Sequence, residues 1–80
     1  HENYDQLSVR VTSVHSGLQS LQSQMGGMGL RADMREAAIR MDALMQKADR
    51  QIQSGDVDGA KTTLDNADRV TSKLEKFLGQ

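Results

Sequence analysis

The chain has 80 residues, enough for one small domain with a single hydrophobic core, and its formal net charge is −1. It contains no cysteine, which excludes disulfide bonds and thiolate metal sites, and the near-neutral charge argues against nucleic-acid binding. No apolar run is long enough to span a membrane, so we expect no membrane insertion. With no proline and only two aromatic residues, Tyr4 and Phe77, the composition favours long helices over a β-sandwich or β-barrel.

Residues 3–25 are predicted to form the first helix, because apolar residues recur there at alternating steps of three and four. These residues are Tyr4, Leu7, Val11, Val14, Leu18, Leu21 and Met25. Such heptad spacing is typical of a helix that packs along one stripe. The β-branched residues between 9 and 12, together with Gly17, make this helix intrinsically the weakest of the chain.

The opposite face of this helix carries serine and glutamine in place of charged residues. Glu2, Asp5 and Arg10 are the only charged residues before residue 26. An uncharged polar face is easier to bury in an interface than a charged one, although exposed Ser and Gln are also common on ordinary surfaces. We therefore predict a candidate interaction face for a protein partner or for self-association, with neutral surface as the alternative. The face consists of Ser13, Ser16, Gln19, Ser20 and Ser23.

Residues 26–29 contain three glycines in four positions, which predicts the end of the first helix and a reversal of the chain. A plain connecting loop is the simpler interpretation. The alternative is a hinge that lets the first helix swing out or exchange with a second copy of the chain.

The second helix is predicted over residues 30–54, with a broad apolar stripe that suits a middle element touching a neighbour on each side. Folding the chain back at residues 26–29 brings inward residues of the first two helices into pairs whose numbers add to 55. Examples are Val14 with Met41 and Leu7 with Ala48. One register therefore serves both helices along their whole length.

A tight turn is predicted at residues 55–56, since Gly55 suits a left-handed helix end and Asp56 suits the cap of a following helix. The third helix then covers residues 57–78 and ends at Gly79. Folding at this turn gives pairs that add to 108 or 109, from Ile52 with Val57 outward to Leu30 with Leu78. We predict an all-α fold, an antiparallel up-down-up three-helix bundle with coiled-coil-like packing that forms one domain over residues 1–80.

Five methionines raise the hypothesis of a copper(I) site, because thioether sulfur is a soft ligand. The candidate ligands are Met25, Met28 and Met34, near the glycine-rich segment. Against this, Met34 lies on the inward stripe, where methionine fills gaps in a core. A copper brace between His1 and His15 is disfavoured, because the helix would separate them by roughly 20 Å.

The segment from Ser54 to Asp65 partly matches a calcium-binding loop, with Asp56, Asp58 and Gly59 at suitable positions. The final bidentate glutamate is missing, and a calcium loop would splay two helices that the register pairs along their length. For hydrolysis, Ser13, His15 and Asp5 share a helix without presenting a nucleophile, base and orienting acid together. We therefore expect a chain that is not an enzyme and uses no cofactor.

The sequence thus predicts a non-enzymatic helical module with a structural or protein-interaction role, and a copper(I)-binding protein is the alternative. The chain begins at His1 rather than at a methionine, which favours a mature exported, periplasmic-type protein or a part of a longer one. The oligomeric state and the partner stay open.

Overall fold

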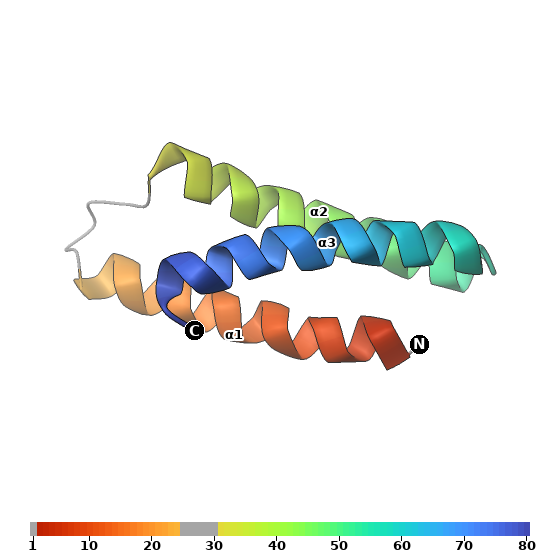
Figure 1. Ribbon diagram of the computed structural model, residues 1–80, viewed down its shortest axis with the longest axis horizontal. Coiled ribbons are helices and arrows are strands. Elements are labelled where there is room, and N and C mark those ends of the chain that lie inside the picture. The colour runs from red at the N-terminus through yellow and green to blue at the C-terminus, as the bar shows by residue number, and fades with distance from the viewer. Residues whose placement is uncertain (1, 25–30) are drawn as a thin grey trace.

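The computed structural model describes residues 2–24 and 31–80, which form three helices packed against each other. They are α1 (Glu2–Gln24), α2 (Ala32–Gln53) and α3 (Val57–Leu78). Figure 1 shows each helix running opposite in direction to the one before it, which gives the up-down-up arrangement. The predicted all-α three-helix bundle is confirmed. The predicted helix bounds at residues 25 and 30 lie outside the described residues, and the other bounds differ from the predicted ones by one residue or fewer.

The turn between α2 and α3 has the predicted chemistry. Gly55 adopts φ 83°, and the amides of Gly55 and Asp56 donate to the carbonyls of Ile52 and Gln51, so the end of α2 is satisfied. The Asp56 carboxylate accepts from the Gly59 amide at 2.9 Å and caps α3. A β-carbon on Gly59 would lie 2.2 Å from Asp56 Oδ2, so glycine is what leaves room for this cap.

The hydrophobic core forms two clusters along the bundle, at positions spaced by three and four residues on each helix. One cluster contains Val14, Leu18, Met34, Ala37, Met41 and Leu74. The other contains Leu7, Met45, Ala48, Leu64 and Ala67. Val14 and Met41 share the first cluster and Leu7 and Ala48 share the second, as the register between the first two helices predicts. The buried Thr71 hydroxyl donates to the Ala67 carbonyl at 2.7 Å, so it is satisfied within its own helix.

The predicted pair nearest the turn between α2 and α3 does not lie in the core. Val57 was expected to meet Ile52, but its residue surface is 60% exposed and Ile52 is only half-buried. The turn between α2 and α3 extends past the N-terminal end of α1 in Figure 1, so α1 does not cover the first residue of α3. The predicted loop at 26–29 and the pairs that involve Met25 or Leu30 lie outside the described residues.

The three helices do not contribute equally to the bundle. The α2–α3 interface is the most extensive, and α1 packs more against α3 than against α2. Three residues of α1 are buried, compared with five of α2 and six of α3. Over the described residues, no helix combines the length and hydrophobicity that crossing a lipid bilayer requires. The bundle is therefore a tightly packed α2–α3 hairpin with α1 laid against it.

Candidate functional site

The predicted interaction face on α1 lies on the outside of the bundle. All five of its residues are exposed, and they follow α1 through its C-terminal half; they are Ser13, Ser16, Gln19, Ser20 and Ser23. Val9, which the sequence analysis left out, belongs to the same side because it precedes Ser13 by four residues, and it is 68% exposed. These small side chains leave a shallow depression over residues 16–24. The face is thus open to a partner along about four turns of helix.

This face differs from the rest of the surface in its charge. Between residues 11 and 24, α1 carries no Asp, Glu, Lys or Arg, although these four types make up 26% of the whole chain. A partner docking here would therefore bury hydroxyl and amide groups, whose desolvation is compensated more easily than that of ions. The face can support a helix–helix contact with hydrogen bonds.

A network around Arg10 holds the N-terminal half of α1 against α3. The Arg10 guanidinium donates to Glu75 through Nε at 3.1 Å and through Nη2 at 2.7 Å, and its Nη2 also donates to the Ser72 hydroxyl at 3.1 Å. A further bond from Nη1 reaches Asp68. These hydrogen bonds raise the pKa of Arg10 and lower the pKa of Glu75. The arrangement keeps the opposite side of α1 turned outward.

Two further contacts fix the C-terminal half of α1. His15 Nε2 lies 2.7 Å from Asp42 Oδ1 on α2, and the Gln80 side-chain amide donates to the Ser13 carbonyl at 3.3 Å. Gly17 allows the end of the chain to approach, because a β-carbon there would lie 2.9 Å from Leu78 Cδ1. Glycine at position 17 weakens the helix intrinsically. The close packing of the C-terminal residues against this position explains why it is nevertheless a glycine.

Four partners of α1 were not predicted from the sequence: Asp42, Asp68, Ser72 and Glu75. The sequence contains one signal for these contacts. Arg10 is the lone cation of the first helix, and Asp68, Ser72 and Glu75 follow one another on the third helix at steps of four and three residues. Finding it requires the register between the first and third helices. The two loops set only the register between neighbouring helices.

Of the proposed copper ligands, Met34 is only 3% exposed and lies in the core cluster with Val14 and Leu18. Met25 and Met28 lie outside the described residues, as does His1. Met34 therefore has the packing role that its position on the inward stripe predicts. Reaching a metal would require it to leave the core.

The other chemical candidates also have structural roles. Asp56, a candidate calcium ligand, caps α3. Over residues 2–24 and 31–80, no three His, Cys, Asp or Glu side chains come together as a metal site would require. His15 pairs with Asp42 instead of Asp5, and Ser13 is exposed. The hydroxyl of Ser13 makes no hydrogen bond to this histidine among the described residues.

No family model, curated protein sequence or solved structure matches this chain. The function therefore has to be inferred from the chain's own residues.

Proposed function

We propose that this protein is a non-enzymatic helical interaction module, in which the α2–α3 hairpin is a scaffold and α1 presents the binding face. The partner is another protein or a second copy of this chain. The observation that carries the proposal is the exposed, uncharged side of α1, from Val9 through Ser23, on a bundle whose other helices are rich in charge.

The packing of α1 supports this proposal in a second way. Its inward residues and the Arg10 network already satisfy the side of α1 that faces the hairpin. The outward side contains small side chains, which let a second helix approach closely, since interhelix distance depends on the residues at the contact. A contact between two α1 helices would be isologous and could close as a symmetric dimer.

The experiment is light scattering over a concentration series for the natural chain and for Ser13→Lys and Ser20→Lys. Self-association through this face predicts an oligomer that both variants weaken, because each places a charge in the contact. Thr62→Lys is the matched control, since Thr62 is exposed on α3, away from α1's outer face. An oligomer that persists in both serine variants would exclude this face. A monomer at every concentration would exclude the second copy as partner.

The copper(I) alternative predicts a stoichiometric site that includes Met34. Titration with copper(I) tests it against Met34→Leu, which preserves the apolar core. The interaction proposal predicts no difference between the two proteins.

A further inference from the structure

A second surface of this molecule lies on the α2–α3 hairpin, away from the outer face of α1. It is a groove between the two helices, with a volume of about 390 Å³. Its floor includes Ala37 and Val70, and cationic side chains from both helices form much of its wall, namely Arg40, Arg69 and Lys73. Asn66 adds an amide to the α3 side. The groove thus offers several hydrogen-bond donors above a small apolar floor.

The cations of this groove have no partners within the described parts of the chain. None of Arg40, Arg69 and Lys73 forms an ion pair or a side-chain hydrogen bond there. Two arginines outside the groove are paired within the chain: Arg10 binds Glu75 and Arg31 binds Asp33 at 2.8 Å. Asp33 also lines the groove, but its pairing with Arg31 already neutralises it.

The register of the hairpin places two of these cations opposite each other. Residues whose numbers add to 109 lie at one level of the hairpin, as Met45 and Leu64 do within one core cluster. By the same rule Arg40 of α2 faces Arg69 of α3 across the groove, and Glu36 faces Lys73 one turn away. Two like charges at one level repel each other unless an anion lies between them. The Arg40–Arg69 level is therefore the point where an anionic group would be bound.

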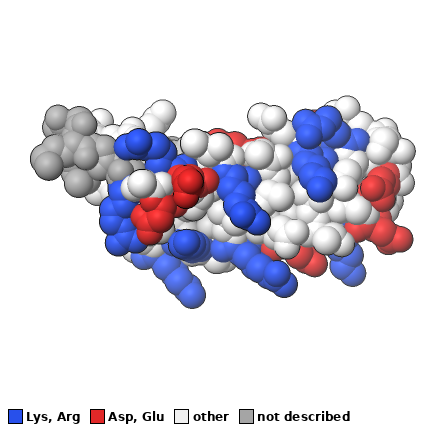
Figure 2. Space-filling model, turned by 90° about the horizontal axis from the view of Figure 1, so that it is seen from above, with Lys and Arg blue, Asp and Glu red and all other residues white. Residues whose placement is uncertain are grey.

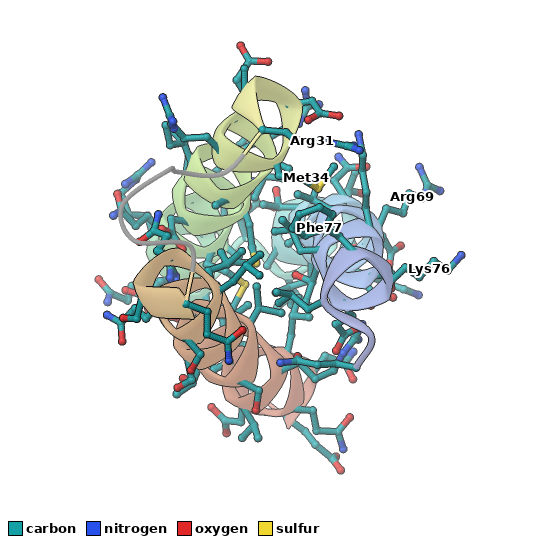
Figure 3. All side chains as sticks on the ribbon, turned by 90° about the vertical axis from the view of Figure 1, so that its left-hand side faces the viewer. Arg31, Met34, Arg69, Lys76 and Phe77 are labelled. Atoms are coloured by element: carbon teal, nitrogen blue, oxygen red, sulfur yellow. The ribbon has the colours of Figure 1, made fainter. Side chains whose placement is uncertain are left out.

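The surrounding charge favours the same kind of ligand. Residues 31–41 and 69–80, which form one end of the hairpin, contain six cations and three acids, whereas residues 42–68 contain three cations and six acids. Figure 2 shows much of the Lys and Arg surface on the half of this face nearest that end. In Figure 3, which looks along the bundle from there, Arg69 and Lys76 project outward from α3. An anionic partner would be steered toward this end.

The geometry favours a carboxylate over a nucleic-acid phosphate. A guanidinium binds a carboxylate or a phosphate through two parallel hydrogen bonds, so the preference comes from the residues around Arg40 and Arg69. The lining residues include no aromatic ring on which a base could stack. Glu36 at the rim would repel a continuous phosphate backbone more than a single carboxylate that avoids it.

We propose that the groove between α2 and α3 binds an acidic segment of a partner protein, with a carboxylate held between Arg40 and Arg69. The Asn66 amide and the floor of Ala37 and Val70 would contact the rest of that segment. This surface is independent of the outer face of α1, so either proposal can fail without the other.

The test is fluorescence anisotropy at low salt with a labelled octaglutamate peptide, using octaglutamine and octathymidylate as comparison probes. We expect octaglutamate to bind and octaglutamine not to bind. Arg40→Glu and Arg69→Glu should each weaken octaglutamate binding by about five- to tenfold, as expected for exposed charge pairs that are lost and replaced by repulsion. Binding should also weaken as salt is added.

The matched control is Lys61→Glu, which makes the same charge change on the other side of α3, where Lys61 lines a different hollow. Thermal unfolding checks that all three variants fold. Equal losses of affinity in Lys61→Glu and Arg69→Glu would overturn the proposal, because net charge alone would then explain the binding. Octathymidylate binding as tight as octaglutamate binding would also overturn it, in favour of a general polyanion surface.

Discussion

The α2–α3 hairpin and α1 are built differently, although all three helices have nearly the same length. The hairpin is closed by a short turn with a capped helix start, and alanine and methionine side chains fill its extensive interface. On α1, three residues are buried, and side-chain pairs from Arg10 and His15 help to hold the helix in place. Charge follows the same division, since α1 carries three of the 21 charged residues.

This difference suggests a division of labour. The hairpin contains eleven of the fourteen buried residues in the described part of the chain, so we expect it to contribute most of the hydrophobic stabilisation. Because α1 has fewer buried residues, we expect it to open from the bundle at a lower free energy than either hairpin helix. Interaction on α1 would then leave the scaffold intact.

The largest expected effect comes from removing the side chain that joins the two regions. Leu74 is fully buried in the cluster that contains Val14 and Leu18 of α1 and Met34 and Met41 of α2. Leu74→Ala should lower the free energy of unfolding by about 2–5 kcal/mol, through lost burial and a cavity. Urea denaturation measures this. A loss below about 1 kcal/mol would mean that the regions do not depend on this contact.

A second prediction concerns the turn that makes the hairpin. Gly55→Ala should destabilise the protein by about 1 kcal/mol, because alanine is strained at a positive φ. Gly79 has the same left-handed conformation, at φ 75°, but lies at the end of α3. Gly79→Ala should reduce the stability less than Gly55→Ala does, since the last turn of a helix can fray. Equal losses of stability in urea would contradict the special role of the 55–56 turn.

A third prediction concerns the tether of α1. Arg10→Met keeps the apolar stem but removes the bonds to Glu75, Asp68 and Ser72. We expect the free energy of unfolding to fall by only about 1 kcal/mol, because the Arg10 side chain is 38% exposed and solvent screens its ion pairs. Lys47→Met is the control, as Lys47 is exposed and forms no ion pair among the described residues. The same loss in both variants would show that the tether contributes nothing specific.

The smallest effect is a dependence on pH. Arg10 lowers the pKa of Glu75 in the folded protein below its ordinary value of 4.5. The stabilisation is therefore fully present above that value and is lost as the pH falls through the lower, folded-state pKa. The stability difference between the natural chain and Arg10→Met should shrink on acidification. Urea unfolding at a series of pH values measures it, and a difference that stays constant with pH would contradict the assignment.

Much of the hairpin could be predicted from local sequence. Gly55 and Asp56 define a turn by their own backbone and capping chemistry, and the turn then sets which residues pair. The inward stripe correctly placed Met34 and Met41 in the core. The exposure of Val57 was not predicted, because a pairing rule between α2 and α3 cannot show how far α1 extends along them.

The surroundings of α1 were harder to predict. The Arg10 network joins residues 58 to 65 positions apart, and its geometry depends on how α1 rotates against a helix to which no loop connects it directly. The outer face of α1 was predictable as exposed, because it is the complement of the inward stripe. The residues of the face do not identify its partner.

The most direct test of this account is native-state amide hydrogen exchange, followed helix by helix in low denaturant. If α1 is the less firmly held element, its amides near Leu7, Val14 and Leu18 should exchange through a local opening. That opening should have a lower free energy than the opening that exposes amides near Met41 and Leu64. If the protected amides of all three helices exchange with one common free energy, the bundle is a single cooperative unit and the division between scaffold and binding helix is wrong.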